Sequence, residues 1–190
     1  MKTDIILAGV GGQGILSIAA VIGEAALSEG LYMKQAEVHG MSQRGGDVQS
    51  HLRISDHPIA SDLIPLGQAD IIISLEPMEA LRYLPYLKAK GWIVSNNRPF
   101  ENIPNYPAIE IVTAAYNAIP HSLLIDVEQI ARDLGAPRSS NVVLLGAASP
   151  YLGVDFEQLV NGIRRIFTRK GEEVVSINLQ ALAAGRSATG

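Results

Sequence analysis

The sequence predicts a three-layer α/β/α fold around a mostly parallel, mixed sheet. Strand-like and helix-like segments alternate through the first half of the chain, and this order joins parallel neighbours through crossover helices. The apolar run ADIIISLEP, which begins at Ala69, is typical of a strand covered on both faces. Residues 47–55 follow a loop too short for a crossover helix, so we expect this strand to run antiparallel.

Each expected element has its own signal in the sequence. In 47–55, apolar and polar residues alternate, as in a half-buried strand. Asp126 and Gln129 have capping-box spacing ahead of a helix that stops at Gly135. The other expected strands are 4–8, 31–38, 91–97 and 108–114, and the other expected helices are 14–30, 77–88, 141–148, 156–167 and 172–185.

Length, charge and hydropathy bound the class of protein. The 190 residues suit one domain, which we place at 1–185, followed by a frayed tail at 186–190. Apolar residues make up 47% of the chain, so a sizeable core can be buried. A net charge of −4 argues against a nucleic-acid surface, which needs clustered Lys and Arg. Without a signal-peptide pattern or an 18-residue apolar run, we expect a cytoplasmic protein that does not enter a membrane.

The residue inventory also limits the chemistry. The chain has no cysteine, which excludes disulfides and thiolate-held iron–sulfur clusters. Its four histidines include no close liganding pair at helical spacing, so no metal site is expected. We find no nucleophile–base–orienter set and no phosphate-loop Lys-Ser/Thr pair. Such a chain is equipped to hold an anionic or polar group, but poorly equipped for difficult chemistry alone.

The glycine turn, residues 9–14 (GVGGQG), is the first candidate site. Gly9, Gly11 and Gly14 fit the G-x-G-x-x-G spacing between a strand and a helix, where backbone N–H groups can approach an anion. A dinucleotide site also needs an acid about 20 residues on, and Glu37 is placed near there, but inside a polar loop. A tight packing turn, a dinucleotide site and a site for another anion or a subunit all remain open.

The polar loop, residues 37–47 (EVHGMSQRGGD), is the second candidate. Arg44 beside Gly45 and Gly46 offers a guanidinium that can bind a carboxylate or phosphate on two atoms. His39 could transfer protons near neutral pH or serve only as a hydrogen-bonding support. Because ligands gather outside the carboxyl ends of strands, we expect this loop and the glycine turn to face one crevice. The alternative is a solvated loop whose glycines only make turns.

Glu76 is a weaker candidate at the end of the apolar strand. Its carboxylate could face the same crevice, or it could be an acid at the start of the Pro77 helix, where the helix dipole favours it. The residues alone do not decide between these two.

Four motifs in order resemble a known family. GVGGQGI, EVHGMSQRGG followed by VQSHLRI, ADIIISLEPMEALRYLPYL and NVVLLGA are similar to the gamma-type subunit or domain of 2-oxoacid:ferredoxin oxidoreductases, nearest to the beta subunit of indolepyruvate ferredoxin oxidoreductase. The likeness covers nearly the whole chain, and residues 98–121 are its least distinctive part.

The resemblance implies an oxidative decarboxylation in which a 2-oxoacid, coenzyme A and oxidised ferredoxin become an acyl-CoA, carbon dioxide and reduced ferredoxin. It implies aryl pyruvates such as indolepyruvate as substrates. Thiamine diphosphate, Mg and [4Fe-4S] clusters would sit on a larger partner subunit, because this chain lacks both cysteines and the GDG…NN thiamine pattern. The chain would then be part of a hetero-oligomer, inactive alone, that reaches ferredoxin through the complex.

The motifs and the resemblance together give the candidate residues. For catalysis at a shared site they are His39 and Arg44, and for cofactor contact they are Gly9, Gly11, Gly12, Gln13, Gly14, Gly40, Ser42, Gln43, Gly45, Gly46 and Glu76. Two rival interpretations stay open: a stand-alone dinucleotide-dependent oxidoreductase, and a non-enzymatic anion-binding module.

Overall fold

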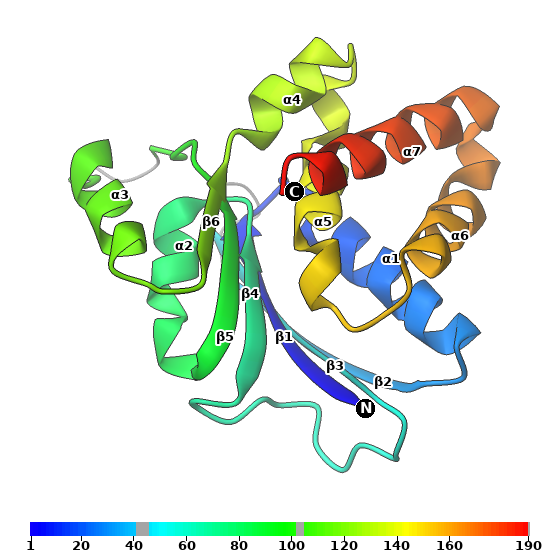
Figure 1. Ribbon diagram of the computed structural model, residues 1–190, viewed down its shortest axis with the longest axis horizontal. Coiled ribbons are helices and arrows are strands. Elements are labelled where there is room, and N and C mark those ends of the chain that lie inside the picture. The colour runs from blue at the N-terminus through cyan, green and yellow to red at the C-terminus, as the bar shows by residue number, and fades with distance from the viewer. Residues whose placement is uncertain (41–45, 102–104, 190) are drawn as a thin grey trace.

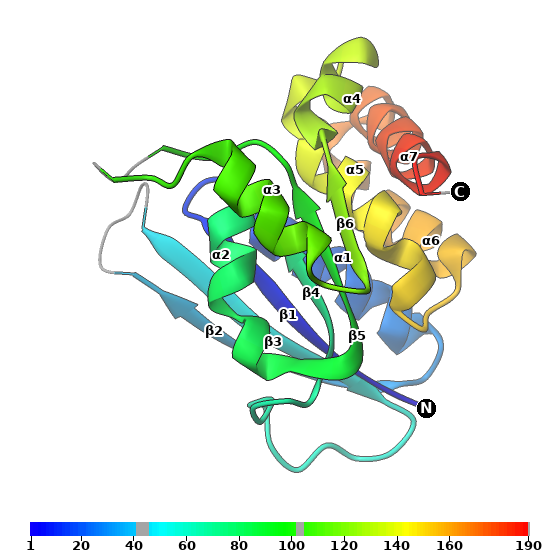
Figure 2. The ribbon, with the colours of Figure 1, turned by 60° about the vertical axis from the view of Figure 1, so that its left-hand side comes forward.

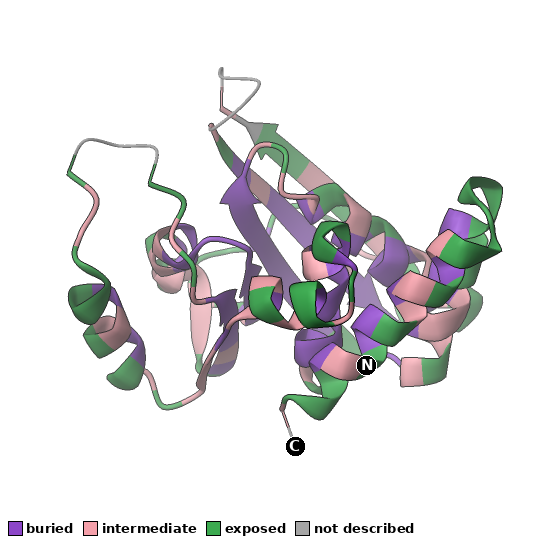
Figure 3. Cartoon of the chain, turned by 90° about the horizontal axis from the view of Figure 1, so that it is seen from above, coloured by how far each residue is buried: buried purple, intermediate pink, exposed green. Residues whose placement is uncertain are grey.

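A six-stranded mixed sheet forms the centre of the molecule, with strand order β2-β3-β1-β4-β5-β6 (Figure 1). The computed structural model describes residues 1–40, 46–101 and 105–189. The strands are β1 (Lys2–Val10), β2 (Tyr32–His39), β3 (Asp47–Ser55), β4 (Ala69–Ser74), β5 (Leu87–Asn96) and β6 (Ser122–Ile125). Seen from above, the central strands are largely buried between the helices (Figure 3), whereas the edge strand β2 is mostly exposed. The predicted three-layer α/β/α class is confirmed.

Helices cover both faces of the sheet (Figures 1 and 2). One face carries α1 (Ile15–Ser28), α4 (Val127–Asp133), α5 (Ser140–Ala148), α6 (Phe156–Phe167) and α7 (Glu172–Ser187), which bury a large aliphatic core. The other face carries α2 (Pro77–Arg82) and α3 (Ile109–Asn117) over a smaller core. None of the helices in the described ranges has the length and hydropathy to cross a membrane.

Strand β3 runs antiparallel to both of its neighbours, as expected. It pairs with β1 from Lys2↔Ser55 to Val10↔Asp47 and with β2 from Tyr32↔Ser55 to His39↔Val48. The pairs β1–β4, β4–β5 and β5–β6 are all parallel. Because β2 and β1 both oppose β3, β2 points the same way as the parallel strands, and its carboxyl end lies at their edge of the sheet.

The predicted strand at 108–114 is wrong, because this stretch forms helix α3. The β-branched residues here favour a strand by local propensity. In the structure, however, Val112 and Tyr116 lie four residues apart and both pack into the smaller core, while Ile111 is exposed. Tertiary packing therefore overrides propensity, and the edge strand of the sheet is β6, which we did not predict.

Several element ends also differ from expectation. Helix α2 stops at Arg82, and Pro85 falls in a separate 3-10 turn, because proline cannot donate the helical hydrogen bond. The cap at Asp126 is confirmed, because its carboxylate accepts from the backbone N–H of Gln129. Asp155 caps α6 in a similar way and accepts from the backbone N–H of Glu157. Helix α7 runs on through Ser187, two residues into the stretch expected to fray.

Helices α5 and α7 cross at a backbone-to-backbone contact. A Cβ atom on Gly185 would lie 1.9 Å from the carbonyl oxygen of Val143, and one on Gly146 would lie 2.1 Å from that of Leu182. Only glycine allows this approach, so the NVVLLGA motif owes its glycine to helix packing. The contact holds α7 against α5.

Candidate functional site

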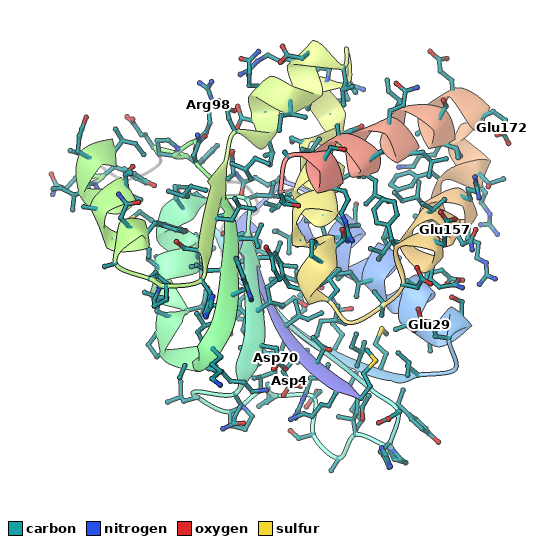
Figure 4. The ribbon with its side chains drawn as sticks, viewed as in Figure 1. Asp4, Glu29, Asp70, Arg98, Glu157 and Glu172 are labelled. Atoms are coloured by element: carbon teal, nitrogen blue, oxygen red, sulfur yellow. The ribbon has the colours of Figure 1, made fainter. Side chains whose placement is uncertain are left out.

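The candidate site lies at the carboxyl edge of the sheet, where β1, β2, β4, β5 and β6 all end. Arg98, just beyond β5, marks this edge in Figure 4, and Asp4 and Asp70 mark the opposite edge. The chain leaves β1 toward α1 on one face and leaves β4 toward α2 on the other. The β1/β4 boundary is therefore the topological switch point, the usual place for a ligand in an open α/β sheet.

The glycine turn and the polar loop touch at this edge. The backbone N–H of Gly11 donates to the carbonyl oxygen of Gly46, with 2.8 Å between the two atoms. The N–H of Gly40 donates to the carbonyl oxygen of Asp47 at 2.9 Å and closes the β2–β3 ladder. The two segments therefore lie at the same edge of the sheet. A crevice lined by both of them stays a prediction, because the described residues of the polar loop line neither of the two hollows beside the glycine turn.

Gln13 holds the glycine turn in place. Its Oε1 accepts from the N–H of Val10 at 2.7 Å, and its Nε2 donates to the carbonyl oxygen of Leu75 at 3.3 Å. The side chain thus spans the switch point from the end of β1 to the end of β4. Because both of its polar atoms bond within the protein, Gln13 positions the turn, and the N–H groups of the turn are better placed to meet a ligand.

The glycines of the turn have different roles. A Cβ on Gly9 would lie 2.9 Å from Oε1 of Gln13, so Gly9 makes room for that brace. Gly14 has φ of 89° and caps α1, and its Cβ would lie 2.7 Å from Nδ2 of Asn141. Gly12 has φ of 98° with open space around it. Gly12 is thus the point where a ligand can come closest to the backbone at the α1 N-terminus.

Glu76 is buried and fully engaged within the protein. It is 2% exposed and caps α2, its Oε2 accepting from the N–H of Glu79 at 2.7 Å. Its Oε1 accepts from the hydroxyl of Tyr106 and, at 3.4 Å, from the N–H of Phe100. Of the two alternatives for Glu76, the structure favours the helix cap, which here also anchors the segment after β5.

An ionisable cluster on α2 faces the start of β3. Burial raises the pKa of Glu79, and the guanidinium of Arg82, 3.0 Å away, opposes that shift. Burial, together with the nearby carboxylates of Glu79 and Asp47, raises the pKa of Tyr83 to about 12. The second carboxylate oxygen of Glu79 is buried without a hydrogen bond to any described residue. Glu79, Arg82 and Tyr83 are therefore close enough to Asp47, the first residue of β3, for their charges to interact.

The family model for pyruvate ferredoxin/flavodoxin oxidoreductase matches residues 4–188, which include every described part of this edge. The chain belongs to that family. The resemblance drawn from the four motifs is therefore confirmed. In this oxidoreductase-family chain, the glycine turn and the end of strand β4 lie at the carboxyl edge of the sheet.

Individual members of the family are similar along the whole chain. Indolepyruvate oxidoreductase subunit IorB from Pyrococcus horikoshii is 38% identical, with 96% of this chain and 93% of the relative covered. The keto/oxoacid ferredoxin oxidoreductase gamma subunit from Geobacter sulfurreducens has a TM-score of 0.72 at 24% identity, covering 98% of each chain. The 2-oxoglutarate:ferredoxin oxidoreductase from Magnetococcus marinus gives 0.79 at 24%, covering 99% of this chain and 31% of that longer chain. The two structures share this fold.

Some predicted site residues lie outside the described residues. They are Ser42, Gln43, Arg44 and Gly45 of the polar loop, together with the side chain of His39, whose backbone ends β2. The structure brings together the backbones of Gly11, Gly12, Gly14, Gly40 and Gly46 at the carboxyl edge. Roles in cofactor contact for these oxidoreductase-family residues remain predictions.

Two asparagines support the site through bonds that the sequence did not predict. Asn141, on α5, packs its amide on Gly14 and donates to the carbonyl oxygen of Gly14 at 3.2 Å. Asn96, 1% exposed at the end of β5, donates to the same Leu75 carbonyl oxygen as Gln13. The local signal for both is an amide at an element boundary, but their partners are 127 and 21 residues away in the chain.

Proposed function

We propose that this chain is the small subunit of an indolepyruvate-type 2-oxoacid:ferredoxin oxidoreductase and completes a reaction centre housed mainly on a larger partner. The observation that carries this proposal is the Gly11–Gly46 hydrogen bond, which places two family motifs side by side at the carboxyl edge. Together they form an edge of glycine backbone, accessible at Gly12, from which N–H groups can meet an anionic co-substrate.

The residues of this chain do not fit the metal groups of the reaction. With no cysteine, it has no thiolate for an iron–sulfur cluster. Within residues 1–40, 46–101 and 105–189, no group of three or more His, Asp or Glu could hold a metal ion. We therefore place thiamine diphosphate, Mg and [4Fe-4S] on the partner. When bound there, they would supply carbanion stabilisation and one-electron transfer.

The contribution of this chain is to bind and orient. In the proposed reaction the 2-oxoacid loses its carboxylate as carbon dioxide, the acyl group passes to the thiol of coenzyme A, and the electron pair leaves one electron at a time to ferredoxin. Coenzyme A carries phosphates, and the glycine edge favours anions. The Magnetococcus marinus structure has coenzyme A and succinyl-CoA bound, which supports this choice of co-substrate. Closing this edge against the partner would also exclude water.

The substrate class follows from the relatives. The IorB subunit at 38% identity is named for indolepyruvate, so we assign an aryl pyruvate to this chain as well. Co-expression with the larger subunit should yield a complex that reduces ferredoxin with indolepyruvate and coenzyme A, and much more slowly with 2-oxoglutarate. Faster turnover of 2-oxoglutarate would contradict the assignment, and turnover by this chain alone would favour a stand-alone oxidoreductase.

Arg44 offers a sharper test, although it lies outside the described residues. Arg44→Ala should lower turnover of the assembled complex while the subunit stays folded and still binds the partner, because a shared site would lose a cation that can hold a carboxylate or phosphate. Arg132→Ala, on the exposed surface of α4, is the matched control. Wild-type turnover for Arg44→Ala, at both limiting and saturating coenzyme A, would remove Arg44 from the site.

A further inference from the structure

A cleft of about 580 Å³ flanks the glycine turn on the side of the helices. Its walls come from three places far apart in sequence: the start of α1, the connection from α4 to α5, and the segment from the end of α6 into the first half of α7. No described residue of the polar loop or of β3 lines it. A separate, smaller hollow on the opposite flank of the turn includes Val48 of β3. The cleft is therefore distinct from the contact between the glycine turn and the polar loop.

The cleft is positively charged. Arg138 and Lys170 line it, and no Asp or Glu is among its described lining residues. The nearest acid in sequence to Lys170 is Glu172, which lines another groove, between α6 and α7, and lies at the outer edge of the molecule in Figure 4. Two cations without a facing carboxylate leave room for an anionic ligand.

Two helices also begin at the cleft. Gly12 and Gly14 line it at the start of the 14-residue α1, and Ser139 and Asn141 line it at the start of the nine-residue α5. Helix N-termini carry free N–H groups and partial positive charge, which add to the charge of the two cations. All of these features favour a phosphate over a neutral ligand.

Two buried polar side chains in the cleft have spare hydrogen-bonding capacity. Ser139 is 5% exposed, and its hydroxyl makes no cap or other hydrogen bond to the described residues. Asn178 is also 5% exposed: its Nδ2 donates to the carbonyl oxygen of Val174 at 2.7 Å, but its Oδ1 accepts from no described residue. Neither atom is among the fully buried unpaired atoms of the described residues, so both stay accessible from the cleft that their residues line and can meet a ligand that supplies an acceptor and a donor.

The remaining wall is apolar. Phe167, Val174 and Ile177 line the cleft, and the ammonium of Lys170 lies 5.3 Å from the centre of the Phe167 ring. An apolar wall next to a cationic end suits a ligand that joins a flat, weakly polar ring to a phosphate. The volume is sufficient for a ligand of nucleotide size.

We propose that this cleft binds a nucleotide phosphate ester, with the phosphate held by Arg138, Lys170 and the N-termini of α1 and α5, and the base against Phe167, Val174 and Ile177. The Ser139 hydroxyl donates to a phosphate oxygen, and Asn178 Oδ1 accepts from an amino or hydroxyl group of the nucleoside. The phosphate ester comes either from the nucleotide end of coenzyme A, an assignment that rests on the proposed function, or from a free nucleotide.

Calorimetric titration of the purified full chain tests the site, with inorganic phosphate, 5′-AMP and 3′,5′-ADP as the probes. The wild-type chain should bind at least one nucleotide more tightly than inorganic phosphate. The double variant R138Q/K170Q should weaken that binding at least about tenfold, and Ser139→Ala by about threefold. The matched control, R132Q/R169Q, removes the same charge from residues that do not line the cleft and should bind like wild type.

The results distinguish coenzyme A from a free nucleotide as the ligand. They also distinguish failure of the cleft proposal from failure of the proposed enzyme activity. If 3′,5′-ADP binds best and R138Q/K170Q raises the KM for coenzyme A in the assembled complex with kcat retained, the ligand is the nucleotide end of coenzyme A. If 5′-AMP binds as tightly and that KM is unchanged, the ligand is a free nucleotide. A folded wild-type chain that binds no probe, or a double variant that binds like the control, overturns the proposal even when the complex turns over indolepyruvate.

Discussion

Gly11 donates its backbone N–H to the carbonyl oxygen of Gly46, and this 2.8 Å contact joins the turn after β1 to the end of the β2–β3 connection. Neither residue has a side chain, so the contact depends only on the positions of two backbones. Those positions are fixed by the β1–β3 ladder, which ends at Val10↔Asp47, and by the Gln13 brace to Leu75. The shared edge is thus a product of sheet register.

Gly14→Ala should destabilise the chain by about 2–3 kcal/mol. A residue with a side chain is strained at φ of 89°, which costs about 1 kcal/mol or more, and the new Cβ would also press on Asn141 Nδ2. Gly30→Ala is the matched control, with φ of 73° but open space around it, and should cost about 1 kcal/mol. Urea unfolding, followed by the fluorescence of Trp92, the single tryptophan, measures both. Equal losses would exclude the Asn141 contact.

Glu76→Gln should lower the free energy of unfolding by about 1–2 kcal/mol, because a neutral amide caps α2 less well and accepts more weakly from Tyr106. Tyr106→Phe should lose about 1 kcal/mol, since only one of those bonds disappears. Because the carboxylate is turned inward, the assembled complex should keep its KM for coenzyme A in both variants. A large rise in KM for Glu76→Gln without loss of stability would restore Glu76 to the cofactor site.

Glu79 should make stability depend on pH. Burial raises the pKa of Glu79 in the folded state. Its stabilising contribution to the free energy of unfolding is therefore complete below the ordinary carboxyl pKa, and it is lost as the pH rises through the raised pKa. Glu79→Gln keeps an acceptor for Arg82 and removes this loss. The variant should therefore gain stability relative to wild type on going from acid to neutral pH. Unfolding curves from roughly pH 4 to 8 test this, with Glu110→Gln on exposed α3 as the control. A constant difference across that range would contradict it.

Gly185→Ala should destabilise the chain by about 3 kcal/mol, because its Cβ would lie 1.9 Å from the Val143 carbonyl oxygen and α7 would have to move. Ala183→Gly, at an exposed position of the same helix, should cost about 1 kcal/mol through propensity alone. Thermal unfolding distinguishes the two. If Gly185→Ala cost no more than its control, the close crossing of α5 and α7 would be refuted.

The fold was largely predictable where local signals and packing agree. The run from Ala69 is apolar on both faces because β4 is central in the sheet, and Asp126 caps α4 through a bond three residues away. The strand prediction for 108–114 failed because its β-branched residues favour a strand by local propensity. In the folded chain, a helix lets Val112 and Tyr116 pack together into the smaller core.

The sequence predicted the backbone of the site, but not the side-chain hydrogen bonds that hold it in place. The glycine spacing of 9–14 and the glycines of the polar loop predicted a shared edge, which the structure has. The side chains that hold that edge act across the fold: Gln13 reaches a carbonyl 62 residues away, and Asn141 reaches one 127 residues away. No local pattern encodes such partners. Glu76 was ambiguous for the same reason, since its role depends on Tyr106 and Phe100.

The hairpin formed by β2 and β3 gives the molecule a modular edge. Gly40 and Asp47 close the ladder at the base of the connection, so both ends of the segment between them are tethered at one point. Strands β1, β4, β5 and β6 are not hydrogen-bonded to β2, so a change in the length of the β2–β3 connection would leave their pairing register as it is.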